Sequence, residues 1–541
     1  TVVGSAIGHF TTSACFQSVG EAVSELLKSK GMKIKNKSYP MASDLTYNIK
    51  PLWEVEGNKR AWLDFQNDVT TKDIKQSVDE NFRSVEHMKR YTTQGMATDQ
   101  GKGSNVIAIA LLADASGETI ERTGTTTFRP PYTPIPIAAI GSSGKDKGFA
   151  PERLTTTHAT SMKLAAPMVE AGLWYRPSYY PKLGECGWLQ SCNREVLSVR
   201  QNVGICDVST LGKIELHGKD AAQFLDFVYA NSFSSLAVGR VRYGLMLRED
   251  GFVMDDGTSA RISENSYLMT TTTAAAGSVM RHLDFVHQAY LPELNVKFVS
   301  VTEQWAQFAV SGPKSVDIIS SVMDGPFNEK DWPFMACGEV KVVGIKARLF
   351  RISFSGELGF ELAIPSRFGS SLFNVLKFEA EQRGGGVYGM EAMNVLRMEK
   401  GFITHAEIDG RATAYDVGMQ KMISEKKDFI GNKMAQRLGL LDPNRERLVG
   451  LKTNGLQSSI TAGSLLFNID DEPLADNNQG YISSAAFSPI ENCYIGLAFL
   501  KRGPERWGEK IKAVNFIADT ELNCEIGPPV FYDPDGEKTR A

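Results

Sequence analysis

The chain has 541 residues, a length that accommodates about three or four domains of ordinary size. Its 59 Lys and Arg nearly balance its 63 Asp and Glu, which excludes a global attraction to nucleic acid or to an anionic membrane, and no apolar run approaches the ~20 residues of a membrane span. Of seven scattered cysteines only Cys186 and Cys192 lie close together, a pattern that favours reduced thiols in the cytoplasm and predicts neither a disulfide framework nor a metal site.

The N-terminal segment, residues 2–27, has the pattern of a dinucleotide-binding fold. Its letters VVGSAIGHFTTSACFQSVGEAVSELL predict a buried strand, a glycine turn and a helix. Gly4 and Gly8 do not form a GxGxxG motif, so a complete dinucleotide site is not expected here. The sequence begins with Thr1 rather than Met and shows no secretory signal pattern, and we expect a fragment or a processed chain.

Residues 62–105 join an amphipathic helical pattern to a polar loop. Apolar residues recur every three or four positions between Ile74 and Met88, and threonines before them are available to cap the helix. The loop at residues 92–105 is rich in Thr, Gly, Asp, Gln and Ser, which suits a phosphate or the edge of a flavin; an ordinary surface loop is the alternative. No cysteine occurs between Cys15 and Cys186, which excludes an iron–sulfur cluster in this segment.

The rest of the chain divides at turn-rich segments. Residues 128–151 are rich in Pro and then in Gly, Ser and Lys, as is typical of an interdomain connection. Alternating strand and helix patterns then predict a large mixed domain from about residue 155 to 439. From about Arg447, short strands separated by turns predict a small antiparallel β-barrel or sandwich.

Within the mixed domain, the letters LREDGFVMDDGTSARIS place two adjacent carboxylates after a turn. The turn spans Glu249 to Gly251, and an extended segment then ends in Asp255 and Asp256. Adjacent residues of a strand point to opposite faces, so only one of the two carboxylates can face a given site. From these residues alone, a solvated turn is the alternative.

Three phrases in residues 64–105 carry a specific resemblance: DFQNDVTTKDI, FRSVEHMKRYT and GMATDQGKGSN. They resemble the alpha subunit of heterotetrameric sarcosine oxidase, and this resemblance covers essentially the whole chain. It implies a beta subunit that carries FAD and oxidises sarcosine, FMN at the alpha–beta junction, and smaller subunits; NAD is expected only if the missing N-terminal domain is present. The flavin-contacting residues would be Thr92, Thr93, Lys102, Thr126 and Arg129.

From about Asn193 onward the chain also resembles the glycine-cleavage T-protein, the aminomethyltransferase that binds tetrahydrofolate. Seven motifs follow in the family's order: VGICDVSTLGKIELHGKDA, DGFVMDDG, YLMTTTT, AVSGP, FSGELGFELAIP, MEAMNVLRMEKGF and GYISSAAFSPIENCYIGLAFL. Together the resemblances imply an α+β multidomain chain. Its parts would be a nucleotide-binding remnant (1–44), a helical module and linker (45–150), a T-protein-like folate-binding α/β domain (151–440) and a C-terminal antiparallel β-barrel (441–541).

The T-protein resemblance assigns roles to individual residues. Asp256, with Asp255 as second candidate, would lie by the folate nitrogens and act as a base. Glu361 would accept hydrogen bonds from the pterin, unless it is an exposed residue at a strand end. Three further side chains complete the expected set: Arg397 near the benzoyl-glutamate, or in a salt bridge with Glu399 or Glu391; Tyr243 against the pterin, or in the core; and Glu357, nearer the turn tip, in solvent.

One segment departs from the T-protein pattern. Where that family carries a VNA-type tripeptide, this chain has Thr270 to Thr273, as sarcosine oxidase alpha subunits do. An aminomethyl group on a lipoyl arm is therefore a poorer substrate than a free iminium or formaldehyde equivalent. The expected reaction converts sarcosine, oxygen and tetrahydrofolate to glycine, hydrogen peroxide and 5,10-methylene-tetrahydrofolate. A stand-alone folate-dependent aminomethyltransferase and a non-catalytic assembly subunit are the alternatives.

Overall fold

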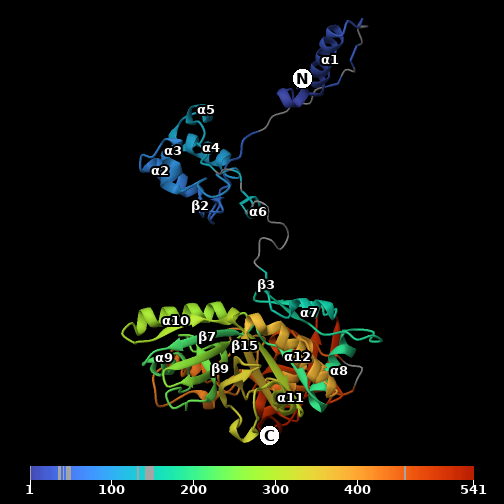
Figure 1. The fold of residues 1–541 in the computed structure, drawn as a ribbon. Coiled ribbons are helices and arrows are strands. Elements are labelled where there is room, and N and C mark those ends of the chain that lie inside the picture. Colours follow the sequence, from blue (N-terminus) through green and yellow to red (C-terminus); the bar gives the residue numbers. More distant parts are fainter. Residues whose placement is uncertain are drawn as a thin grey trace. The chain divides into compact units, whose positions relative to one another are not determined.

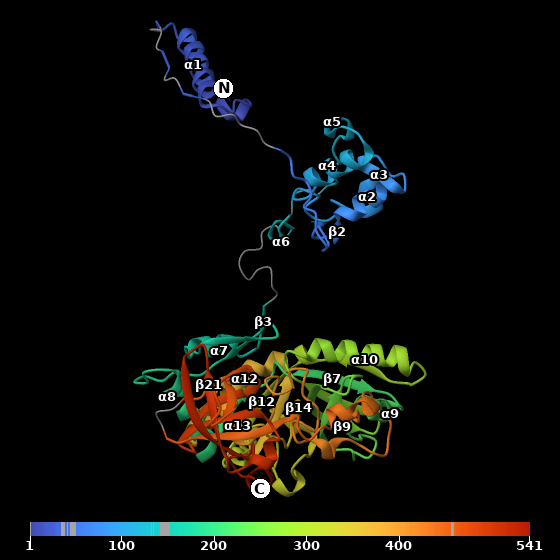
Figure 2. The same ribbon diagram turned by 180° about the vertical axis from the view of Figure 1, so that it is seen from behind.

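The structure is a computed structural model that describes residues 2–33, 38–39, 42–43, 50–130, 133, 135–140, 152–455 and 459–541. It divides into two compact units, Thr1–Lys145 and Asp146–Ala541 (Figures 1 and 2). The domain boundaries expected at 44/45 and 150/151 lie outside the described residues, as does most of the expected connection at 128–151. These limits, and the one at 440/441, stay predictions.

The first described segment contains the predicted helix but not the predicted strand. Helix α1 (Thr12–Ser29) begins at Thr11, whose hydroxyl accepts a hydrogen bond from Ala14 N at 3.2 Å. Gly4–Ile7 form a 3-10 helix where a buried strand was expected, and Val2 is 63% exposed. The strand prediction is wrong because no described strand pairs with these residues, and an unpaired strand leaves its backbone groups unsatisfied.

A small helical module follows, built around one core. Its elements are β1 (Trp62–Asp64), β2 (Val69–Thr70), α2 (Thr71–Asp79), α3 (Val85–Thr92), α4 (Asn105–Ser116), α5 (Ile120–Thr123) and α6 (Ile137–Ile140). Thr70 and Asp73 form a capping box at the start of α2, which confirms the threonine cap. The helical pattern is split in two because Asn81 adopts φ 69°, and Ser84 then caps α3. Ile74, Val78, Val85 and Met88 pack in the shared core.

The larger unit opens with a short sheet and two helices. The sheet has the order β3-β5-β4, and its elements and the neighbouring helices are β3 (Arg153–Leu154), α7 (His158–Lys163), β4 (Met168–Ala171), β5 (Trp174–Pro177) and α8 (Trp188–Gln201).

A five-stranded sheet with the order β11-β7-β10-β9-β8 follows. Its strands are β7 (Gly212–His217), β8 (Arg240–Leu247), β9 (Val253–Ser263), β10 (Ser266–Thr271) and β11 (Lys297–Ser300). Helices α9 (Ala221–Val228) and α10 (Ala276–Tyr290) cover one face, where Leu216, Met246 and Met269 are buried; α10 runs along this sheet in Figure 1. The opposite face therefore remains for contact with the rest of the unit.

A second sheet has six strands in the order β13-β14-β15-β12-β6-β16. Its elements and helices are β6 (Gly204–Asp207), β12 (Trp305–Ser311), α11 (Ser315–Val322), β13 (Cys337–Val342), β14 (Ile345–Phe350), β15 (Gly359–Pro365), α12 (Gly369–Gln382), β16 (Gly386–Val387) and α13 (Met390–Glu399). Helices α11 and α12 pack on its outer face, against residues such as Phe308 and Leu362. Helices α8 and α13 cover part of the inner face, around Cys206 and Ala309.

The inner faces of the two large sheets meet in a mixed core. Val241, Ala260 and Leu268 of the five-stranded sheet are buried against Phe350 and Ala363 of the six-stranded one. Any side chain on these inner faces therefore lies at or beside the contact between the two sheets.

The C-terminal strands close into a barrel with the order β17-β20-β19-β18-β21-β22, which confirms the barrel and adds one strand that the sequence patterns did not indicate, β22. The strands are β17 (Glu446–Thr453), β18 (Leu465–Asn468), β19 (Gly480–Ser488), β20 (Cys493–Lys501), β21 (Lys510–Asn515) and β22 (Thr520–Gly527), preceded by the short helix α14 (Asn432–Ala435) and followed by α15 (Glu537–Arg540). The segment after β22 returns to the six-stranded sheet: Phe531 N and Tyr532 N both donate to Glu399 O at 2.8 Å, and Thr539 Oγ1 donates to Gly356 O at 2.9 Å.

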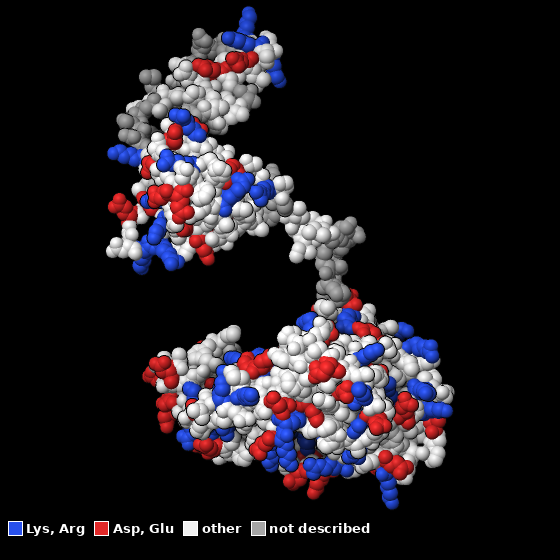
Figure 3. Space-filling view, turned by 90° about the vertical axis from the view of Figure 1, so that its left-hand side faces the viewer, with Lys and Arg blue, Asp and Glu red and all other residues white. Residues whose placement is uncertain are grey.

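The surface carries both signs of charge. On the face shown in Figure 3, basic and acidic side chains are interspersed over the larger unit. None of the described helices is long and apolar enough to cross a membrane.

Candidate functional site

Asp256 lies on the inner face of the five-stranded sheet. The register of β8 and β9 pairs Leu245 with Asp256 and Tyr243 with Thr258. Tyr243 is therefore the diagonal neighbour of Asp256 on one face, within reach of a long side chain. Its hydroxyl donates to Asp256 Oδ2 at 2.7 Å. The strand fixes this pair, and the tyrosine orients the carboxylate.

Burial sets the charge state of this carboxyl group. Burial raises the pKa of Asp256 to about 6, and the hydrogen bond from Tyr243 only partly opposes this rise. The nearby His405 also favours the ionised form of Asp256, and His405 Nε2 is buried without a hydrogen-bond partner among the described residues. A carboxylate with a pKa near 6 is ionised at neutral pH and is a stronger base than a free aspartate.

Asp255 points to the opposite face, as the alternation predicted. It accepts hydrogen bonds from Thr272 N at 3.3 Å and from Thr272 Oγ1 at 2.6 Å, and burial raises its pKa to about 6. Both aspartates lie inside β9 rather than at its end, because the strand continues to Ser263. Asp255 is thus a support for the threonine segment, while Asp256 remains on the inner face.

The threonines that replace the T-protein tripeptide are held by hydrogen bonds. Thr270 Oγ1 lies 2.8 Å from Thr258 Oγ1, and Thr273 Oγ1 lies 3.0 Å from Thr210 Oγ1. With Thr272 bonded to Asp255, three of the four hydroxyls bond another side chain, and Thr271 Oγ1 donates to Thr272 O at 3.1 Å. These hydroxyls stiffen the end of β10.

Glu361 lies on the inner face of the six-stranded sheet and is 7% exposed, which contradicts an exposed strand-end position. In the register of β12 and β15 it is diagonal to Gln307, whose amide nitrogen donates to Glu361 Oε2. Burial raises the pKa of Glu361, while Gln307 and the charge of Lys213 act in the opposite direction. Among the described residues nothing donates to Glu361 Oε1, and Gln307 Oε1 is buried without a partner. Bonding capacity therefore remains on both side chains.

Lys213 of β7 completes this region, and the sequence patterns did not indicate it. It is fully buried, and its Nζ donates to Ser209 O at 2.8 Å and Leu211 O at 3.1 Å. Burial lowers its pKa to about 8, although Asp207 and Glu361 favour the charged form. The strand pattern alone does not show on which face of the sheet a lysine lies. The pairing of β7 with its neighbouring strand shows that Lys213 lies on the inner face.

Arg397 is buried in a different arrangement from the one expected. It pairs with Glu407 at 2.9 Å and donates to Ser484 Oγ at 2.7 Å. The expected partners lie elsewhere: Glu399 pairs with Arg200 at 2.5 Å, and Glu391 accepts from Ser178 at 3.0 Å. The guanidinium is therefore bonded within the protein, and a folate contact for it stays a prediction without geometric support.

Glu357 is also not in solvent. It is 3% exposed and pairs with Arg200 at 3.0 Å. The expectation of a solvated turn tip is wrong because a long-range partner, which local sequence does not show, buries the turn.

The proposed flavin-contacting loop belongs to the helical module. Thr92 Oγ1 donates to Met88 O at 2.8 Å, Thr93 ends α3 with φ 64°, and Arg129 N donates to Gln100 Oε1 at 3.0 Å. Thr126 is buried, and its hydroxyl has no hydrogen-bond partner among the described residues. Lys102 is exposed. These residues share one module, but no contact in the structure tests a flavin there.

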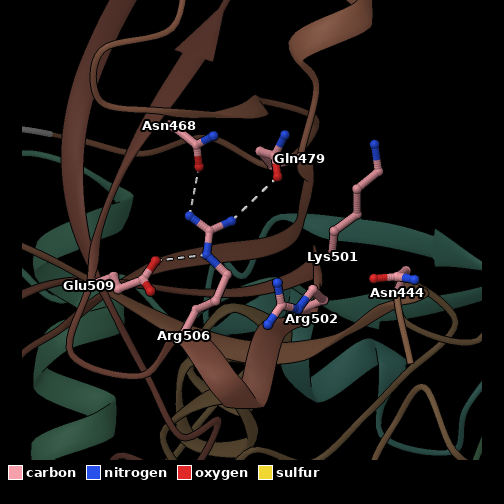
Figure 4. A pocket seen from close by; sticks show the side chains of 7 residues that line it. All are labelled: Asn444, Asn468, Gln479, Lys501, Arg502, Arg506 and Glu509. Carbon is pink, nitrogen blue, oxygen red and sulfur yellow. Dashed lines mark hydrogen bonds and ion pairs between the residues drawn. The ribbon is translucent and has the colours of Figure 1, made fainter.

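A surface pocket of about 390 Å³ on the barrel contains none of the predicted residues. Figure 4 shows Arg506 in this pocket bonded to Glu509, Asn468 and Gln479. Arg502 pairs with Glu505. Both arginines are paired, Lys501 donates to Asn478 O at 2.7 Å, and no residue predicted from the sequence lines this pocket, so it is not the candidate site. Among the described residues, no three His, Cys, Asp or Glu side chains are grouped so as to hold a metal ion.

Known proteins match this chain in three regions. Residues 58–144 match the Sarcosine oxidase A3 domain, residues 157–427 the GCVT N-terminal domain, and residues 446–533 the Glycine cleavage T-protein C-terminal barrel domain. The middle match alone covers half of the chain.

Individual relatives also match this chain over most of its length. The sarcosine oxidase subunit alpha of Rhizobium meliloti (strain 1021) is 46% identical over 90% of this chain, and that of Corynebacterium sp. (strain U-96) is 39% identical over 90%. The chain covers 50% and 52% of these two subunits, about half of their length. The crystal structure of glycine cleavage system aminomethyltransferase T from Bartonella henselae superposes with a TM-score of 0.61 at 20% identity, covering 70% of this chain and 99% of that one, which shows a shared fold.

Both resemblances found in the sequence are thereby confirmed, and so is the multidomain α+β fold with its C-terminal barrel. The chain belongs to the family of the GCVT N-terminal domain, here combined with a sarcosine oxidase A3 domain and a T-protein C-terminal barrel.

Proposed function

We propose that this chain binds tetrahydrofolate between its two large sheets and uses it to trap the one-carbon unit released by sarcosine oxidation, as 5,10-methylene-tetrahydrofolate. The observation that carries the proposal is the pair Asp256 and Tyr243 on one inner face, with the buried and incompletely bonded Glu361 on the facing sheet. Two carboxylates held in this way suit a ligand with N–H groups along its length.

The chemistry needs one base. Formaldehyde and the N5–H and N10–H groups of tetrahydrofolate yield the bridging methylene group and one water. Two C–N bonds form, the carbon–oxygen bond breaks, and the two nitrogen protons leave. Asp256, ionised above pH 6 or so, would accept the proton from one nitrogen as that nitrogen attacks, and Tyr243 would hold the carboxylate in place.

Glu361 would hold the other end of the ligand. A pterin carries a 2-amino group and an N3–H on one edge, and a carboxylate accepts from both at once. Glu361 Oε1 supports this role because no described residue donates to it, and the neighbouring Gln307 Oε1 is buried without a partner, so the site keeps acceptors for the N–H groups of a ligand.

We extend the proposal to the partners and cofactors of a complete oxidase. The names of the relatives, sarcosine oxidase subunit alpha, support a role within a sarcosine oxidase. We propose in addition a beta subunit that carries flavin, smaller subunits as partners, and a cytoplasmic location. FMN would be shared with the beta subunit, and its contacts on this chain would be Thr92, Thr93, Lys102, Thr126 and Arg129. NAD binding stays conditional on a nucleotide-binding domain.

Of the two alternatives, the stand-alone aminomethyltransferase has some support, since the Thermus thermophilus aminomethyltransferase is 29% identical over 65% of this chain. The matched A3 domain favours the oxidase assembly instead, because it occupies residues 58–144, outside the T-protein-like region. A non-catalytic assembly subunit would not need a base whose pKa burial raises to about 6.

Calorimetry of tetrahydrofolate binding to the full chain tests the proposal, together with the rate of methylene-tetrahydrofolate formation from formaldehyde. We expect Glu361→Gln to weaken binding at least tenfold. Asp256→Asn should bind tetrahydrofolate normally, but its reaction should be about 10² to 10⁴ times slower than that of the wild type. The uncatalysed rate in buffer is subtracted from both. The wild-type rate should fall tenfold per pH unit below about 6, as Asp256 becomes protonated. Absence of binding by the wild type would refute the proposal and favour the assembly subunit.

A further inference from the structure

Lys213 is a buried ammonium group that makes no ion pair with any described residue. Its two hydrogen bonds go to backbone carbonyl oxygens, Ser209 O and Leu211 O. An ammonium group has three donors, so one remains. A buried cation with an unused donor is costly unless a further acceptor meets it.

The sheet register places Lys213 on the inner face, in the row of the proposed folate site. Lys213 pairs with Thr270 of β10, Thr270 bonds Thr258 of β9, and Thr258 pairs with Tyr243 of β8. Side chains directly opposite each other on neighbouring strands share a face. Lys213 thus lies on the same sheet surface as Tyr243 and Asp256, three strands away from the tyrosine.

Two carboxylates, Asp207 and Glu361, favour the charged form of this lysine, and Asp207 already accepts hydrogen bonds from Ser209 N and Thr157 Oγ1. The charge of Lys213 favours ionisation of Glu361, and Glu361 in turn favours the charged lysine. They are nevertheless not in ion-pair contact, since Lys213 bonds two carbonyls and Glu361 bonds Gln307. Lys213 thus keeps an unused donor, and Glu361 keeps an oxygen to which no described residue donates.

We propose that Lys213 donates to the 4-oxo group of the folate while Glu361 accepts from the N3–H and 2-amino groups beside it, so that the pair selects 2-amino-4-oxo pteridines. This inference rests on the proposed function. The edge of such a ring presents two donors followed by one acceptor, which matches a carboxylate followed by an ammonium. In a 2,4-diamino ring the 4-oxo acceptor is replaced by an amino donor, and N3 no longer carries a hydrogen to donate to Glu361. That amino group meets the ammonium donor, and neither is satisfied.

The other buried cation of this interior is less suited to the role. Arg176 is 7% exposed and makes no hydrogen bond to a described residue, but its charge acts chiefly on Cys206 and Asp207. Glu361 responds to Lys213 instead. The lysine is therefore the cation that shares a ligand edge with Glu361.

Lys427 provides a matched control. Its ammonium also donates to two backbone carbonyls, Asp226 O and Tyr229 O, and burial likewise lowers its pKa to about 8. It lies by α9, on the helix-covered side of the five-stranded sheet. Lys427→Met removes a partly buried ammonium group with the same type of hydrogen bonds, without touching the proposed site.

The test is calorimetric binding of tetrahydrofolate and of its 4-amino analogue, tetrahydroaminopterin, to the full chain. We expect the wild type to prefer the 4-oxo compound by about 10- to 100-fold, the range that one charge-assisted hydrogen bond supplies. Lys213→Met should weaken tetrahydrofolate binding by that factor and reduce the preference at least tenfold, leaving only the part that comes from N3–H and Glu361. Lys427→Met should leave the preference unchanged.

The outcomes distinguish a failure of the proposed function from a failure of the role assigned to Lys213. If the wild type binds neither compound, the proposed function fails and this inference fails with it. If the wild type binds both equally, or Lys213→Met keeps the preference, only the role of Lys213 is overturned. Should Lys213→Met not fold, as judged by circular dichroism, a wild type that binds both compounds equally still overturns the role of Lys213, and Lys213→Arg, which retains donors, should keep the wild-type preference within about threefold.

Discussion

Two of the groups of buried charged residues in the larger unit differ in how completely they are bonded. Arg200 donates to Glu399, Glu357, Ser355 O and Leu396 O, so its guanidinium is fully used. In the inter-sheet group, Lys213 and Glu361 both keep unused bonding capacity. Burial alone therefore does not distinguish structure from function, whereas the remaining donors and acceptors do.

The largest loss of stability is expected when Arg200 is replaced. Arg200→Met leaves Glu357 and Glu399 buried without their cation, and we expect the free energy of unfolding to fall by about 3 to 5 kcal/mol. Urea unfolding of the full chain, followed by circular dichroism, measures it. A loss below about 1 kcal/mol would mean that the triad is not structural.

A smaller loss is expected at the second fully bonded pair. Glu407→Gln keeps the volume of the side chain but removes the charge opposite Arg397, and stability should fall by about 2 to 3 kcal/mol. The same unfolding experiment gives the value. If tetrahydrofolate binding fell while stability did not, Arg397 would belong to the ligand site after all.

Removing a charge from the inter-sheet group should raise the free energy of unfolding at neutral pH instead of lowering it. Burial raises the folded-state pKa of Asp256 to about 6, above the unfolded value of about 3.9. The stability that the protonated form contributes is present below pH ~4 and is lost as the pH rises to about 6. Asp256→Asn avoids this loss, so at pH 7.5 the variant should be more stable than wild type by about 1 to 2 kcal/mol, with no difference near pH 4. Unfolding at both pH values checks the sign, and a less stable variant at pH 7.5 would show that Asp256 is structural.

The smallest change in stability is expected at an exposed ion pair, which serves as a reference for the buried pairs. Lys452 forms a surface ion pair with Glu491 at 2.5 Å, and its side chain is 43% exposed. Lys452→Met should change the free energy of unfolding by less than about 1 kcal/mol, and added salt should reduce the difference. A larger change would mean that exposed pairs contribute more in this protein than the comparison assumes.

Local patterns predicted most of the elements and part of the site. Strand alternation placed Asp255 and Asp256 on opposite faces, and short strands separated by turns predicted the barrel. What escaped prediction depends on distant partners. Glu357 is buried by Arg200, which lies 157 positions away, and Lys213 acquires its face only through pairing with β10. The N-terminal strand failed for the same reason, because local letters do not supply a neighbouring strand.

The return of the segment after β22 has a consequence for how the unit folds. The ring of Tyr532 lies over the guanidinium of Arg200 at 3.9 Å, and its hydroxyl donates to Glu357, 175 positions away. Glu399 follows Arg200 by 199 positions, and at about 5–20 residues per second a ribosome needs about 10 to 40 s to make that interval. Throughout that time, and until Tyr532 has been made, the nascent chain holds charges that have no partners. The charged cluster around Arg200 is therefore completed only after Tyr532 has been made, close to the end of the sequence.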